Sequence, residues 1–269
     1  MRRWLQMGLG LLAAATLSAS ALPGAAMAAG KPSPFANWAA VVVAGDYHAA
    51  HDSEETEAFD NARRDVTTAL STEMGFQPGN VRQFSVRPGR YPDTRPGSST
   101  VFNIYDNLKE LAGQAKGGCL FYYTSHGAPE GAYLGSEDPD GATLIFPTEL
   151  TELIERACPK RPVIVVISTC FSAVNIPAMS KPNWMVMTAA RKDRTSFGCS
   201  ARDTYPYFDA CFLSQLKAAK NFAVLAPAVK ACIGQKEIDT GMRPPAEPQT
   251  YIGGAMLPLL PLMPFPHGG

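Results

Sequence analysis

The segment VIVVISTCFS, Val163 to Ser172, begins with five consecutive apolar residues that favour β-structure. An unbroken apolar run of this length is typical of a strand buried on both faces, as in parallel sheets. The run ends in Ser168, Thr169 and Cys170. In sheets of this class, functional residues gather in the loops beyond the carboxyl ends of the strands. The segment therefore predicts a rigid central strand that holds a thiol at its tip.

The rest of the chain repeats this pattern, with apolar strands alternating with amphipathic helices. Such alternation favours an α/β fold in which a mainly parallel sheet is covered by helices on both faces. The first long helix is expected from residue 54, after a capping box formed by Asp52 and Glu55. We expect strands at 38–44, 81–86, 119–124 and 184–189, a hairpin over 131–146, and helices at 54–74, 100–115, 148–157, 207–219 and 224–233.

Composition and charge indicate one ordinary globular domain, which we place at residues 29–269. The chain has 269 residues, 46% of them hydrophobic, with 24 basic and 24 acidic side chains. This is enough apolar material for a sizeable core. The zero formal net charge gives no indication of a nucleic-acid partner or of a membrane-surface partner.

The first 28 residues have the layout of a secretory signal peptide. Arg2 and Arg3 precede an apolar stretch over 7–17, and Ala26-Met27-Ala28 resembles a cleavage site. We therefore expect export, to the periplasm or the medium, with an uncleaved N-terminal anchor as the alternative. We expect no membrane span in the mature chain, because prolines interrupt the apolar tail at 255–265.

The six cysteines are compatible with disulfides in an exported protein. There is no Cys-x-x-Cys motif, which argues against a thioredoxin-like site or a structural zinc site. The pairing cannot be read from the sequence. If Cys170 is a free thiol, an odd number remains, so at least one more cysteine is unpaired. The other five are Cys119, Cys158, Cys199, Cys211 and Cys232.

A second apolar strand, in CLFYYTSHG (119–127), ends in His126-Gly127. If this strand and the one before Cys170 are neighbours in a parallel sheet, the imidazole and the thiol emerge at the same edge. A cysteine attacks as the thiolate, and a nearby imidazole can take its proton. Gly127 would let a substrate carbonyl approach backbone N–H donors. In the alternative interpretation, Cys170 is packed or disulfide-bonded and His126 is a satisfied polar group.

The loop GDYHAAHD, residues 45–52, offers a further possibility. His48, His51 and Asp52 could bind a metal, although a solvated loop beside the site is the simpler interpretation. His48 could also contact substrate, because the loop follows the carboxyl end of the first strand. We expect neither a metal nor a cofactor.

Four blocks in order resemble the legumain-type peptidase C13 family of caspase-like cysteine peptidases. They are WAAVVVAG (38–45), FYYTSHG (121–127), VIVVISTCFSA (163–173) and MTAARKDRTSFGCSARDTYPYFDACF (187–212). Cys170 also follows His126 by 44 residues, close to the spacing of about 50 in caspase-like enzymes. The resemblance implies a three-layer caspase-like sandwich that acts on peptides or proteins.

Site roles follow from the resemblance. It implies that His126 is the general acid and base, that Cys170 is the nucleophile, and that the N–H groups of Gly127 and Cys170 form an oxyanion hole. The sequence also departs from the legumain pattern. Tyr47 stands where legumain-like enzymes carry Asn, and Ser168 stands where they carry a pocket acid.

The remaining pocket positions also differ. Ala173 replaces a Gly, Glu57 lies where a basic pair reads the substrate, and Asp209 is similar in place to the pocket aspartate. We therefore expect Tyr47, His48, Glu57, Ser168 and Asp209 to line the substrate site. Glu57 and Asp209 together would suit a basic or amide side chain.

The leading hypothesis is an exported cysteine endopeptidase that works through an acyl-enzyme. A transpeptidase would use the same two residues. Two alternatives from other classes remain: a catalytically impaired domain that binds peptides or partners, and a structural envelope domain with Cys170 in a disulfide.

Overall fold

The computed structural model describes residues 32–50, 54–138 and 141–268. The chain divides into two units, residues 1–31 and 32–269, and the description below concerns the second. The predicted signal peptide lies outside the described residues. So do Asp52 of the predicted capping box and the tip of the predicted hairpin at 139–140.

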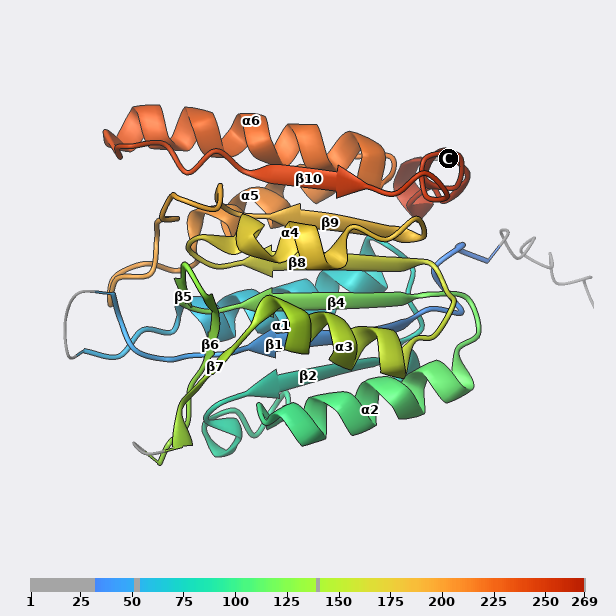
Figure 1. Cartoon of the computed structure of the whole chain (residues 1–269), viewed down its shortest axis with the longest axis horizontal. Helices are drawn as coiled ribbons and strands as arrows, with labels where there is room; N and C mark the ends of the chain where they lie inside the picture. Colours follow the sequence, from blue (N-terminus) through green and yellow to red (C-terminus); the bar gives the residue numbers. More distant parts are fainter. Residues whose placement is uncertain (1–31, 51–53, 139–140, 269) are drawn as a thin grey trace, which may run out of the picture. The chain divides into compact units, whose positions relative to one another are not determined.

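The second unit is built on a seven-stranded sheet (Figure 1). Every pairing in this sheet is parallel except that of β10 with β9. The strand before Cys170, β8, lies beside β4, the strand before His126, as predicted for a shared site. The strand order is β10 (Gln249–Ile252), β9 (Trp184–Thr188), β8 (Val163–Ser168), β4 (Cys119–Thr124), β1 (Ala39–Ala44), β2 (Val81–Ser85) and β3 (Gly97–Ser98).

Helices cover both faces of this sheet, so its central strands are buried on both sides. Alternate residues of β1, β4 and β8 enter two separate hydrophobic cores. One core is shared with α1 (Ala58–Thr72), α5 (Tyr207–Leu216) and α6 (Phe222–Thr240). The other is shared with α2 (Val101–Gln114), α3 (Pro147–Ala157) and α4 (Ile176–Met179). This is the predicted α/β three-layer sandwich.

A small antiparallel sheet lies at the carboxyl ends of the parallel strands, on the left of Figure 1. It comprises β5 (Gly127–Ala128), β6 (Gly131–Leu134) and β7 (Thr143–Ile145). The predicted hairpin over 131–146 is present as β6 and β7. The first strand, β5, was not predicted, and it follows His126 directly.

The predicted start of the first helix is wrong. Helix α1 begins at Ala58 rather than at residue 54. Glu55 instead pairs with His48 in an isolated antiparallel bridge. The Thr56 hydroxyl accepts the Ala58 N–H at 3.2 Å and donates to the Ser200 carbonyl at 2.9 Å, which anchors this segment to a distant loop. This hydrogen bond to Ser200 holds Thr56 outside the helix, so α1 begins after it.

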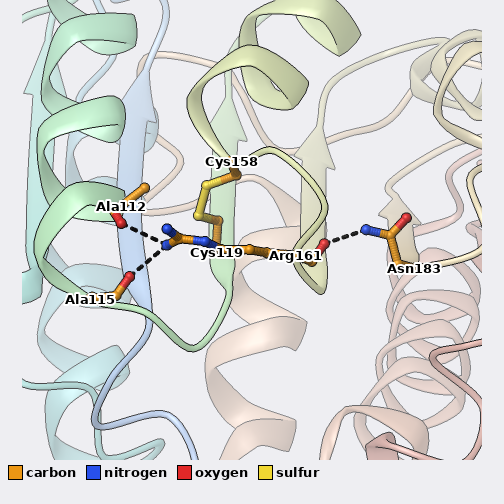
Figure 2. Close-up of a disulfide and its surroundings, with 6 residues drawn as sticks. All are labelled: Ala112, Ala115, Cys119, Cys158, Arg161 and Asn183. Atoms are coloured by element: carbon orange, nitrogen blue, oxygen red, sulfur yellow. Dashed lines mark hydrogen bonds between the residues drawn. A yellow bond between two sulfur atoms is a disulfide. The ribbon is translucent and has the colours of Figure 1, made fainter.

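Two disulfides reinforce the layers. Cys119 pairs with Cys158, joining the start of β4 to the end of α3, and Cys211 pairs with Cys232, joining α5 to α6. Figure 2 shows that the Arg161 guanidinium lies near the first bridge and donates to the Ala112 and Ala115 carbonyls, both at 2.7 Å. A cation at this position satisfies carbonyls at the end of α2.

No helix among the described residues is both long enough and apolar enough to cross a membrane.

Candidate active site

His126 and Cys170 occupy equivalent places at the ends of adjacent strands. Thr124 at the end of β4 pairs in register with Ser168 at the end of β8. His126 and Cys170 each come two residues later, and the Ser125 N–H still donates to the Ser168 carbonyl at 3.2 Å. Both side chains are half-buried. The topology thus brings the predicted acid–base residue and the predicted nucleophile to one edge of the sheet.

A tight turn presents Cys170. The next residue, Phe171, has a left-handed backbone with φ of 56° and ψ of 13°. A non-glycine residue in this region costs roughly 1–2 kcal/mol, and such strain concentrates at functional sites. The Phe171 N–H donates to the Arg194 carbonyl at 2.8 Å, which holds the turn against the loop after β9.

That loop also contacts the sulfur. The Cys170 Sγ accepts the N–H of Ser196 at 3.3 Å and lies 3.6 Å from the Ser196 hydroxyl oxygen. Cys170 and Cys199 are the free cysteines of the chain. Burial, followed by the nearby Cys170 thiol, raises the pKa of Cys199 to about 12, so Cys199 stays protonated at neutral pH. Of the two free thiols, Cys170 is the one that follows a central strand.

The ring of His126 is fixed by contacts on two sides. Its Nε2 lies 2.9 Å from the main-chain oxygen of His48. Because a carbonyl oxygen can only accept, Nε2 carries the proton, and a neutral ring then has an unprotonated Nδ1. The edge of the ring contacts Phe59, with centroids 5.1 Å apart at 80°. A neutral imidazole in this tautomer has one free basic nitrogen.

Gly127 packs closely against the backbone of the turn that carries Cys170. A Cβ at this position would collide with the Cys170 carbonyl oxygen and lie 2.8 Å from the Thr169 hydroxyl. The Tyr133 N–H donates to the His126 carbonyl, so Gly127 and Ala132 form a non-hydrogen-bonded pair. The ladder between β5 and β6 therefore does not use the Gly127 N–H.

Asp209 and Ser168 lie beneath the site rather than on its surface. Asp209 is 0% exposed and Ser168 is 2% exposed. The Asp209 carboxylate accepts from the hydroxyls of Ser168 at 2.6 Å, Tyr122 at 2.5 Å and Thr124 at 3.1 Å. Burial raises the pKa of Asp209 to about 6, although the three hydroxyl donors oppose the rise. The expectation that these two side chains contact substrate is corrected accordingly, because both are enclosed and already bonded to each other.

Glu57 is also occupied by groups of its own chain. Its carboxylate contacts Arg90 at 2.9 Å and Arg87 at 3.4 Å, and it accepts the Tyr91 hydroxyl at 2.7 Å. Arg87 and Arg90 also pair with Glu55, so the two arginines balance the charges of two glutamates. The expected preference for a basic or amide substrate side chain rested on Glu57 and Asp209, and both carboxylates are bonded to groups of this chain.

Tyr47 and His48 remain at the surface of the site. The Arg87 guanidinium lies over the half-buried Tyr47 ring, with its central carbon 4.2 Å from the ring centroid. The exposed His48 ring packs against Tyr47. Through its carbonyl, His48 also touches His126. The structure thus groups Tyr47, His48 and His126 in one place.

The sequence interpretation missed Asp46, whose carboxylate organises this loop. An Asp just after a strand that ends in Gly is a signal for a turn held by its own side chain, and it could have been used. The sequence also did not indicate that Ser196 contacts the Cys170 sulfur.

No metal centre is supported by the described ranges, which contain no group of three or more His, Cys, Asp or Glu side chains placed to hold an ion. His51 and Asp52, two of the three residues considered for a metal, lie outside those ranges.

Residues 101–224 match the family model of the Peptidase C13 family, and this region contains both His126 and Cys170. No curated protein matches the sequence. Among solved structures, the crystal structure of caspase-1 from Spodoptera frugiperda is similar, with a TM-score of 0.54 and 15% identity. The similarity covers 81% of this chain and 87% of that one, and at this identity it concerns the fold alone. The family match over residues 101–224 and the caspase-like fold together support the predicted resemblance to the legumain-type Peptidase C13 family.

Proposed function

We propose that this protein is an exported cysteine endopeptidase that uses His126 and Cys170. The family is one of caspase-like cysteine peptidases, whose substrates are peptides or proteins. The observation that carries the proposal is the in-register pairing of β4 with β8, which sets the imidazole and an unpaired thiol at adjacent strand ends.

The chemistry follows from this arrangement. The Cys170 thiol gives its proton to Nδ1 of His126, and the thiolate attacks the substrate carbonyl carbon to form a tetrahedral oxyanion. The N–H groups of Gly127 and Cys170 are the proposed donors to that oxygen. His126 then protonates the leaving amine as the C–N bond breaks, which leaves a thioester on Cys170.

Water completes the cycle. His126 takes a proton from the water as it attacks the thioester, and the Cys170 sulfur leaves and regains a proton. If an amine attacks instead of water, the same steps join two peptides. The buried cluster of Asp209 and Ser168 offers a substrate no charge, so we infer that selectivity rests on the surface loop of Tyr47 and His48.

Export is supported by two features. The signal-like layout of residues 1–28 predicts it, and the disulfides Cys119–Cys158 and Cys211–Cys232 suit an oxidising compartment.

Thiol labelling tests the proposal directly. Protein lacking residues 1–28 is treated with iodoacetamide at neutral pH, and modification of each cysteine is followed by peptide mass mapping. We expect Cys170 to react much faster than Cys199, and the His126→Ala variant to lose that advantage. Equal, slow labelling of Cys170 in wild type and in His126→Ala would contradict the dyad and favour a binding role.

A further inference from the structure

The loop after β1 is organised by one buried carboxylate. Asp46 is 8% exposed, and its Oδ1 accepts the N–H of Tyr47 at 2.7 Å and the N–H of His48 at 3.1 Å. The same oxygen lies 2.7 Å from Nδ1 of His48. Because a carboxylate only accepts, Nδ1 of His48 is protonated in this contact. One oxygen therefore fixes both the backbone and the side chain of His48.

The main chain of His48 contacts His126, the proposed acid–base residue. The His48 carbonyl oxygen lies 2.9 Å from Nε2 of His126. This contact sets the tautomer of His126 and fixes its ring. The hydrogen bond that one ring nitrogen makes determines which of the two nitrogens carries the proton. The carbonyl belongs to a loop, and Asp46 is what fixes the loop at that point.

We propose that Asp46 is a positioning residue for the reaction: through the two backbone N–H groups of Tyr47 and His48, it aims the His48 carbonyl at His126 and so keeps Nδ1 of His126 free to take the Cys170 proton. The inference rests on the proposed function for its kinetic consequence, and on geometry alone for its effect on His126.

Packing on the far side of the loop supports this assignment. The Gly135 N–H donates to the Gly45 carbonyl at 2.6 Å, and a Cβ at Gly135 would lie 3.3 Å from Oδ1 of Asp46. The residue that follows β6 thus packs against Asp46. The carboxylate is held in one place and has little access to solvent, as a rigid support for a catalytic group requires.

Two substitutions of Asp46 distinguish the role of its hydrogen-bond acceptor from the role of its negative charge. Asp46→Asn keeps a carbonyl oxygen for the two N–H groups, and Asp46→Ala removes it. The matched control is Glu149→Ala, which also removes a carboxylate that accepts a backbone N–H, that of Phe146 at 3.0 Å, but at the start of α3. Thermal unfolding of each variant shows whether it is folded at the assay temperature.

We expect Asp46→Ala to lower kcat by about 10- to 100-fold with KM nearly unchanged, since a small misplacement of a catalytic group has an effect of this size. Asp46→Asn should recover most of the loss, and Glu149→Ala should behave like wild type. In ¹⁵N-histidine NMR, wild-type His126 should show a protonated Nε2 and an unprotonated Nδ1. Asp46→Ala should show a mixture of tautomers at His126. The chain has four histidines, so a His126→Gln spectrum assigns the signal.

Wild-type kcat together with a wild-type His126 tautomer in Asp46→Ala would overturn the inference, as would an equal loss in Asp46→Asn and Asp46→Ala. If wild type itself cleaves no peptide, the proposed function fails, and the NMR comparison still decides whether Asp46 sets the His126 tautomer.

Discussion

The Ser168 hydroxyl donates a hydrogen bond of 2.6 Å to the buried carboxylate of Asp209. Ser168 lies two residues before Cys170, at the end of β8. Thr124, the register partner of Ser168 on β4, donates to the same carboxylate oxygen at 3.1 Å. A single oxygen on α5 therefore joins the ends of the two strands that carry the dyad. The legumain-like pattern has an acid at the Ser168 position. Here a hydroxyl replaces it and bonds to Asp209, so this part of the site supports the strands and offers no charge to a substrate.

The titration of Asp209 makes stability depend on pH. Burial raises its pKa to about 6, whereas an unfolded Asp titrates at about 3.9. The folded state therefore binds the proton more tightly, and this contribution is fully present below about pH 4 and is lost as pH rises through 6. The loss amounts to roughly 3 kcal/mol. Asp209→Asn cannot titrate here, so the unfolding free energy of wild type relative to this variant should fall by that amount between pH 4 and pH 7.

Urea unfolding of both proteins at several pH values provides the measurement. A difference between the two proteins that stays constant with pH, or that grows in favour of wild type as pH rises, would contradict the assignment.

Gly127 should not tolerate a side chain. In Gly127→Ala the new Cβ would overlap the Cys170 carbonyl oxygen, and the strand would have to shift away from the nucleophile. We expect kcat/KM to fall by about 10²- to 10³-fold, as when one oxyanion donor is removed. The matched control is Gly113→Ala in α2, where a Cβ meets nothing within 4 Å. That variant should be as active as wild type and up to about 1 kcal/mol more stable. Equal activity in Gly127→Ala and Gly113→Ala would contradict a role for Gly127 in the active site.

The Cys119–Cys158 bridge should support stability without affecting catalysis. It closes a loop with a sequence separation of 39, for which chain entropy predicts about 4 kcal/mol. It lies at the amino end of β4, about 20 Å along the strand from His126. Replacing both cysteines with Ala should lower the unfolding free energy by about 2–4 kcal/mol and leave kcat/KM within about twofold at a temperature where the variant is folded. Loss of activity in a folded variant would contradict this separation of roles.

The sequence predicted β1, β4, β8 and β9 closely because each of them is largely an unbroken apolar run. The parallel strand β3, which is two residues long, was not predicted. The predicted strand 119–124 is β4, and the run that begins at Val163 is β8. Elements set by contacts distant in sequence were predicted less well. Helix α1 starts late because Thr56 bonds to Ser200, and β5 contains two residues, too few to show an alternating pattern.

The site divides in the same way. The meeting of His126 and Cys170 at one edge followed from strand order, which the sequence suggested and the structure confirms. The roles of the surrounding side chains depended on burial and on hydrogen-bond partners. Ser168 and Asp209 were predicted to line the pocket, but they are hydrogen-bonded to each other inside the protein. Glu57 pairs with Arg87 and Arg90, which it shares with Glu55. Ion pairs of this kind join segments far apart in the chain, so a single sequence does not reveal them.

Peptide cleavage by Cys170 and His126 can be tested in a single assay. Protein lacking residues 1–28 is incubated, under mild reductant, with a fluorogenic peptide library in which the residue before the cleaved bond varies. Wild type is compared with Cys170→Ala, His126→Ala and Cys199→Ala, the last removing the other free thiol. We predict turnover by wild type and by Cys199→Ala, and none by the other two. Turnover that persists in Cys170→Ala, or that is absent from wild type across the library, would contradict peptide cleavage by Cys170 and His126.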